Sequence, residues 1–180
     1  MTTRVRAISV LVVLLGSVTT AVAGTPLEIS VEPVTLLDAG KIAGCGLKAT
    51  ARADDATTIG EVIAFRSGDV TVFSVRARAV DGAGIAMRPS HIRLTTASHD
   101  TRTLFPAPRP HSDGQIETRA HLAGFTGSSF AQELMVMGGR FEVRREDQST
   151  LTFDLPLPMP HTVRQAYLNC AGDLFRPEDE

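Results

Sequence analysis

Histidines are the residues with the clearest chemical potential, because four of the five gather in one part of the chain: His91, His99, His111 and His121. His99 precedes Asp100, and His111 precedes Asp113 by two positions. Imidazole beside carboxylate can bind zinc or copper, or form a general base with its orienting partner. The chain has no H-x-H, H-x-x-x-H or H-E-x-x-H spacing. Ordinary surface histidines are therefore the simpler interpretation, and we assign no metal ligand and no cofactor.

Serine-based catalysis has weaker support in the sequence. Ser98, His99 and Asp100 are neighbours, but a catalytic triad requires convergence in space rather than adjacency. The chain contains no G-x-S-x-G nucleophile motif. Gly138-Gly139 lacks the lysine and helix that follow a phosphate loop, and we interpret it as a two-residue hairpin turn. We predict no catalytic residue and a protein that is not an enzyme.

The two cysteines, Cys45 and Cys170, are predicted to form a disulfide that closes a loop of 170 − 45 = 125 residues. Two free thiols and an intermolecular link are the alternatives. Cys45 begins an alternating segment and shares its apolar phase, whereas Cys170 lies on the apolar face of a predicted helix. Both side chains should therefore point into one core, where a bridge can form.

The first residues have the pattern of a cleaved export signal. Arg4 and Arg6 precede an apolar run from Ala7 to Gly16, and Ala21-Val22-Ala23 fits a cleavage site. The alternative is a membrane anchor, but the apolar run is shorter than the roughly 18 residues of a spanning helix. Cleavage after Ala23 leaves 180 − 23 = 157 residues, with no second long apolar run to span a membrane. We predict a periplasmic or secreted protein.

Composition argues against several classes of ligand. The mature chain would carry 18 − 2 = 16 basic and 20 acidic residues, a net charge of 16 − 20 = −4, and therefore no general attraction for nucleic acid. Sugar-binding and single-strand-binding proteins stack ligands on exposed aromatic rings. Here there are eight Phe, one Tyr and no Trp, and the phenylalanines mostly fall in phase with other apolar residues. Neither class is favoured.

Most of the mature chain alternates between apolar and polar residues with the period of a β-strand. The predicted strands are 25–37, 45–53, 59–65, 70–80, 91–96, 115–122, 130–137, 140–145 and 150–155. The proline-rich segment 105–114 is predicted to be a surface loop that pairs with no strand, and 124–129 a connection. This pattern predicts a mainly β protein, a single-domain antiparallel β-sandwich or flattened barrel over residues 24–175, followed by a charged tail at 176–180.

One helix is predicted near the C-terminus, over 161–170. Thr162 and Gln165 fit a capping box, and Gly172 fits the residue that ends a helix. Its apolar face carries Val163, Ala166, Tyr167 and Cys170.

In outline the chain resembles small exported β-sandwich proteins of Gram-negative bacteria. The likeness depends on the export signal, the early Cys45-Gly46-Leu47 strand and the late cysteine on a helix. We predict a non-enzymatic binding or interaction module of the bacterial cell envelope, whose ligand is a protein or a small molecule. The alternative is a metal-dependent exported enzyme or metal carrier that uses the region from His91 to His121. The sequence leaves the identity of the partner and the oligomeric state open.

Overall fold

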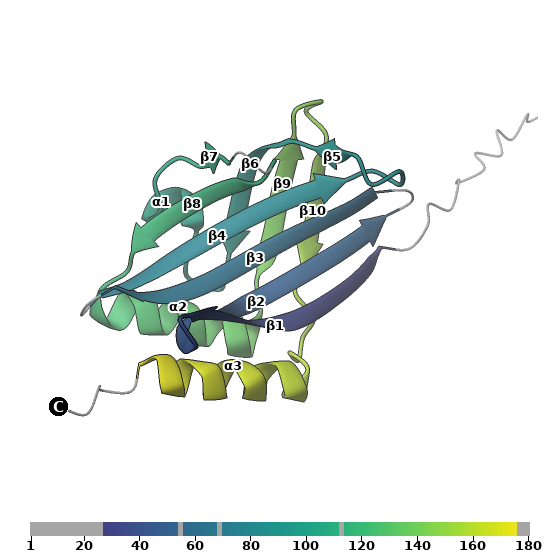
Figure 1. Ribbon diagram of the computed structural model, residues 1–180. Coiled ribbons are helices and arrows are strands. Elements are labelled where there is room, and N and C mark those ends of the chain that lie inside the picture. The colour runs from purple at the N-terminus through teal and green to yellow at the C-terminus, as the bar shows by residue number, and fades with distance from the viewer. Residues whose placement is uncertain (1–26, 54–55, 68–69, 112–113, 176–180) are drawn as a thin grey trace, which may run out of the picture.

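The computed structural model describes residues 27–53, 56–67, 70–111 and 114–175. The predicted export signal, the charged tail and Asp113 lie outside these residues. The described chain is mainly β, with two antiparallel sheets and three helices, which confirms the predicted fold class (Figure 1). None of these helices is long and apolar enough to cross a membrane.

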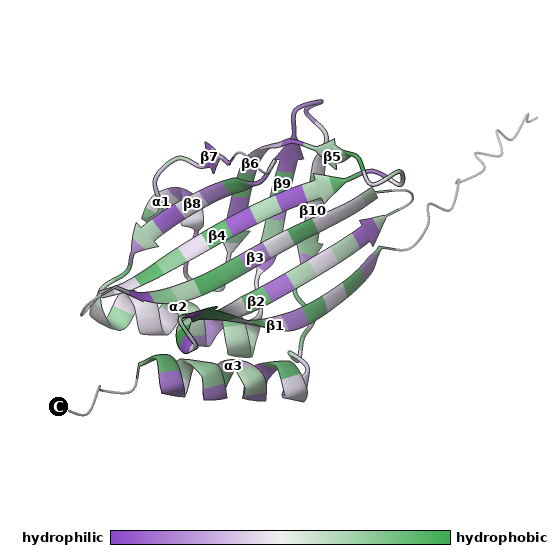
Figure 2. Cartoon of the chain, in the orientation of Figure 1, coloured by the Kyte–Doolittle hydropathy of each residue, from purple (hydrophilic) through white to green (hydrophobic). Residues whose placement is uncertain are grey.

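The larger sheet is a meander of four long strands that continues into shorter ones. Its order is β1 (Glu28–Asp38), β2 (Lys41–Ala53), β3 (Ala56–Ser67), β4 (Val70–Val80), β8 (Ile116–His121) and β7 (Arg109–Pro110), while β5 (Ala86–Met87) also pairs with β4. Apolar and polar residues alternate along β4, as Figure 2 shows by colour, because successive side chains point to opposite faces of a sheet. One face of this sheet therefore joins the core, and the other, which we call the outer face, does not.

The smaller sheet supplies the second layer. Its order is β10 (Thr150–Asp154), β9 (Arg140–Arg145) and β6 (Pro89–Thr95). Phe141 of β9 packs against β3 so closely that a Cβ added at Gly60 would lie 2.8 Å from its ring. On the same side of the small sheet, Phe141 stacks on Phe153 with ring centroids 5.3 Å apart. The core thus lies between the two sheets.

Two helices complete the core: α2 (Gly124–Met137) and α3 (His161–Leu174). In Figure 1, α2 lies behind the large sheet, and α3 runs below β1 and β2. The short helix α1 (Thr101–Leu104) follows β6. Phe130 of α2 is fully buried, and its ring meets the rings of Phe73 and Phe105 at centroid distances of 5.3 and 6.0 Å.

The predicted strand at 130–137 and connection at 124–129 are wrong, because both belong to α2. Phe130 and Leu134 are buried, whereas Val136 and Met137 are exposed, a distribution that alternation does not produce. Gly138, with φ of 71°, follows the last helical residue, so it ends a helix instead of turning a hairpin. Ala, Gln, Glu, Leu and Met are all good helix formers, so the sequence of α2 did carry a helical signal.

Two smaller expectations also need correction. Arg109 and Pro110 do pair with β8, although the proline-rich segment around them was expected to join no strand. Helix α3 follows Pro160 with no side-chain cap, so the capping box at Thr162 is absent. The helix also continues through Gly172, where a Cβ would meet nothing within 4 Å, and ends at Leu174.

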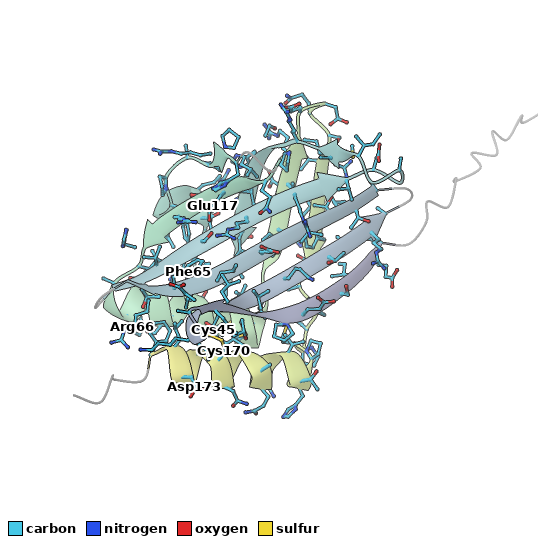
Figure 3. All side chains as sticks on the ribbon, viewed as in Figure 1. Cys45, Phe65, Arg66, Glu117, Cys170 and Asp173 are labelled. Atoms are coloured by element: carbon cyan, nitrogen blue, oxygen red, sulfur yellow. A yellow bond between two sulfur atoms is a disulfide. The ribbon has the colours of Figure 1, made fainter. Side chains whose placement is uncertain are left out.

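The cysteines meet where α3 crosses β2, as predicted (Figure 3). Their Sγ atoms lie 2.01 Å apart, at disulfide distance, and their Cα atoms 5.8 Å apart. Both side chains are buried, Cys45 among the inward residues of β2 and Cys170 on the inward face of α3. That face carries Val163, Tyr167, Cys170 and Leu174, spaced one or two turns apart.

Candidate functional site

A row of charged residues crosses the outer face of the large sheet from edge to edge. Strand register places each of its members directly opposite the next: Glu32, Lys48, Glu61, Arg76, Glu117 and Arg109. The signs alternate along the whole row. Two of its pairs are in contact, Lys48 Nζ with Glu32 Oε2 at 2.6 Å and Arg76 Nε with Glu117 Oε1 at 2.8 Å. Each pair of opposite charges on facing strands stabilises a sheet by roughly 0.2–1 kcal/mol.

The outer face is electrically polarised, because its two halves carry different charges. In the registered rows before the β1 bulge at Leu36 and Leu37, β1, β2 and β3 present three acids and two bases, which gives 2 − 3 = −1. These residues are Glu28, Glu32, Glu61, Lys48 and Arg52. The strands β4, β8 and β7 present four bases and one acid, Arg76, Arg78, Arg109, Arg119 and Glu117, which gives 4 − 1 = +3. The whole sequence has a net charge of −2. Positive charge is therefore concentrated locally on a chain that is acidic as a whole.

Glu117 is the centre of this basic half. Its side chain is only 7% exposed, and Ser74 donates a hydrogen bond from its hydroxyl to Oε1. Arg76 Nε and Arg119 Nε each lie 2.8 Å from the same oxygen, and His111 Nε2 lies 2.9 Å from Oε2. We call these five residues the Glu117 cluster. They come from β4, β8 and the segment after β7, so the cluster ties three parts of the sheet together.

Phe65 of β3 supports the two arginines of the cluster. The guanidinium carbons of Arg76 and Arg119 lie 6.0 and 5.8 Å from its ring centroid, within cation–π range. The ring in turn lies over Gly44 of β2, where an added Cβ would be 3.0 Å from Phe65 Cδ1. Figure 3 shows Phe65 and Glu117 on the same side of the large sheet. The absence of a side chain at Gly44 thus leaves room for the ring, and the ring helps to hold the guanidinium groups in place.

Hydrogen bonds keep Glu117 ionised in spite of its burial. Burial by itself would raise the pKa of this carboxyl, but the hydrogen bonds from Arg119, Ser74 and Arg76 outweigh that effect and lower its pKa to about 2. The carboxylate therefore remains charged throughout the physiological range and holds both guanidinium groups.

Glu117→Gln is expected to change how stability depends on pH. The folded pKa of about 2 lies below the ordinary value of 4.5, so ionised Glu117 stabilises the fold above pH 4.5. That contribution disappears as the pH falls from 4.5 towards 2. The variant should lose about 1.5–3 kcal/mol at pH 7, the usual worth of hydrogen bonds to a charged group. It should also show a shallower loss of stability below pH 4.5.

Urea denaturation across this pH range measures both effects. Glu146→Gln, an exposed glutamate in the turn after β9, is the matched control and should follow the unmodified protein. If Glu117→Gln and the unmodified protein lost stability in parallel as the pH fell, the assigned role of the carboxylate would be wrong.

A recess of about 510 Å³ opens beside the cluster, between β8 and the segment that leads into β7. Its lining includes Pro106, Arg109, His111, Glu117, Thr118 and Arg119. Thr118 donates a hydrogen bond from Oγ1 to the Pro106 carbonyl at 2.6 Å, which fixes this segment along β8. The recess thus combines a basic rim with an apolar wall from the prolines.

Another carboxylate, the half-buried Glu133 of α2, holds the turn after β6. Thr96 donates from Oγ1 at 2.6 Å, the Ser98 backbone N–H donates at 2.9 Å, and His99 Nδ1 lies 3.0 Å away, all at Oε2. Burial opposes ionisation, but the bonds from Thr96, Ser98 and His99 outweigh it and lower the pKa of Glu133 to about 2. Because each partner belongs to the turn, this arrangement fastens α2 to the small sheet.

The histidine-rich region therefore divides into separate sites. His99 contacts Glu133, whereas Asp100 pairs with Arg93 at 2.7 Å and caps α1 by accepting from the Arg102 backbone N–H. Ser98, His99 and Asp100 thus form no triad. His91 is half-buried on β6, and His121 is exposed at the end of β8.

Among residues 27–53, 56–67, 70–111 and 114–175, no group of three or more His, Cys, Asp or Glu could hold a metal ion. The sequence pointed to His111 but not to its partner Glu117, nor to Arg119 and Ser74, which contact Glu117. The local sequence indicated only that Glu117 and Arg119 lie on the same face of one predicted strand, and Ser74 and Arg76 on the same face of another. No protein-family model, curated protein or solved structure matches this chain.

Proposed function

We propose that this protein is an exported, non-enzymatic β-sandwich of the bacterial cell envelope that binds an anionic ligand through the basic half of its outer face. The observation that carries the proposal is the charge of +3 presented by β4, β8 and β7 on a chain whose net charge is −2. A local field of this kind attracts negatively charged ligands even when the whole protein is acidic.

The Glu117 cluster supports a binding role because it prepares the surface before a ligand arrives. Arg76 and Arg119 are each anchored through Nε and packed near Phe65. Ordering long side chains at a binding surface ordinarily costs about 0.5–1.5 kcal/mol for each one. Two arginines that are already ordered avoid most of that cost.

Export is supported by two features of the chain. The two cysteines at disulfide distance are compatible with an extracellular or periplasmic location. The predicted signal sequence also indicates a periplasmic or extracellular location. The metal-dependent alternative has no comparable support among the described residues, because His99 and His111 contact separate glutamates in different parts of the fold.

Photo-crosslinking in the envelope tests the proposed function. A crosslinking residue at His121, on the outer face of β8, should give a specific product that Arg119→Gln reduces and Arg144→Gln leaves unchanged. Arg144 is an exposed arginine of β9 and matches the change in charge. The same residue placed at Thr152, exposed on β10, should give no such product.

A small ligand would instead be seen as added mass in native mass spectrometry of protein isolated from the envelope. The absence of both a crosslinked product and added mass, or equal labelling at His121 and Thr152, would contradict the proposal.

A further inference from the structure

We infer that the recess beside the Glu117 cluster binds a phosphate or sulfate group, with Arg109, His111 and Arg119 as the residues that hold it. This inference rests on the proposed function and specifies its ligand. The recess of about 510 Å³ falls within the roughly 300–1,000 Å³ of small-molecule sites. It can therefore hold the organic part of a small phosphate or sulfate ester as well as the anionic group.

The lining supplies donors of the right kind. Arg119 is tethered to Glu117 through Nε, and a guanidinium carries five N–H donors in a planar fork. The amino groups of that fork suit the paired oxygens of phosphate or sulfate, which arginine binds with two parallel hydrogen bonds. Arg109 lies directly across from Glu117 in the register, and its side chain is exposed at the rim. His111 approaches Glu117 through Nε2 and is itself exposed beside the recess.

Charge favours an anion over a cation in this recess. Among the lining residues that the structure describes, Arg109 and Arg119 are positive and Glu117 is negative, which gives 2 − 1 = +1 without His111. The carboxylate is already contacted by Ser74, Arg76, Arg119 and His111. A cation would have to displace these donors, whereas an anion needs only the remaining arginine donors. Glu117 is thus a positioning residue that orients Arg119 and does not itself contact the ligand.

The walls indicate where the rest of the ligand lies. Pro106 and Ala107, which precede β7, and Pro110 of β7 line the recess and present apolar surface. The Thr118 hydroxyl is bonded to the Pro106 carbonyl, so this wall is held in place. A ligand with a phosphate or sulfate group and a small carbon skeleton can satisfy both surfaces, with the anion at the arginines and the skeleton against the prolines.

Titration calorimetry at low ionic strength tests the inference with inorganic phosphate, sulfate and glycerol phosphate as probes. Saturable binding is expected, with glycerol phosphate tighter than inorganic phosphate because of the apolar wall. Arg109→Gln and Arg119→Gln should each weaken binding about tenfold or more, the effect of losing a hydrogen bond to a charged group. Arg144→Gln should leave binding unchanged. Both replaced arginines are exposed, and Arg119→Gln also loses its bond to Glu117. An unchanged far-UV circular dichroism spectrum and a cooperative thermal transition would show that each variant is folded.

Binding to vesicles distinguishes the two sources of the phosphate or sulfate group, a lipid headgroup and a soluble ester. Phosphatidylcholine vesicles with and without phosphatidylglycerol should bind differently if the source is a lipid headgroup, and alike if it is a soluble ester. No saturable binding of any probe up to about 10 mM, a range that includes even weak specific sites, would overturn the inference. A loss of binding in Arg144→Gln as large as the loss in Arg119→Gln would overturn it as well. If the crosslink at His121 persisted in either case, the proposed function would stand and only the ligand class would be wrong.

Discussion

Phe130→Ala is expected to lower the free energy of unfolding by about 3–5 kcal/mol, the usual cost of removing a buried aromatic ring. The side chain of Phe130 is 0% exposed and is surrounded by other rings. Phe73 meets it edge-on at 5.3 Å, His99 at 5.9 Å and Phe105 at 6.0 Å between centroids. Truncation would leave a cavity where α2 packs between the turn after β6 and the large sheet. Urea denaturation at neutral pH measures the change.

Phe125→Ala is the matched control, because the same residue type occurs five positions earlier in the same helix. Phe125 is 85% exposed, so its removal should change stability by less than about 0.5 kcal/mol. Equal losses for the two variants would contradict the packing of α2, and with it the correction of the predicted strand at 130–137.

Cys170→Ser is expected to lower the free energy of unfolding by about 2–5 kcal/mol under oxidising conditions. The two sulfur atoms are at disulfide distance, and the residues they join are 125 positions apart. A link over so long a loop greatly restricts the unfolded chain, and chain-entropy models give about 4–5 kcal/mol for it. The link also holds α3 against β2, the contact that closes one side of the core.

Denaturation with and without reductant separates the disulfide from simple packing. The unmodified protein should lose stability on reduction, whereas Cys170→Ser should be insensitive to reductant. Peptide mapping without reductant should recover a fragment that joins Cys45 to Cys170. Free thiols at both positions in protein from the envelope, or equal stability of the two proteins under oxidising conditions, would mean that the bond does not form.

The sequence alone determined the elements in which apolar residues recur at a regular local spacing. Cys45, Leu47, Ala49 and Ala51 alternate with polar or small residues, so the phase of β2 and the inward direction of Cys45 followed directly. The spacing of Val163, Tyr167 and Cys170 defined the inward face of α3 in the same way. The apolar face of β2 carries Cys45, and the apolar face of α3 carries Cys170. Because both faces must pack into one core, the two cysteines could be predicted to meet.

Helix α2 shows where local pattern failed. Its sequence is apolar on several sides, and the glycines and serines before it together with Gly138-Gly139 after it mark a strand as readily as a helix. The structure favours the helix because it buries Phe130 and Leu134 against residues far along the chain, such as Phe73. Local helix propensity and the flanking turn residues point in different directions, and tertiary packing decided between a helix and a strand.

The candidate site was determined by tertiary structure almost entirely. Arg76 and Glu117 are 41 positions apart and meet only because β8 pairs with β4 in one register, next to β7. A shift of one residue would turn Glu117 and Arg119 towards the core. The sequence contains the alternation that makes each strand, because alternation is local. Which charges face one another depends on strand order and register, and these follow from how the whole core packs.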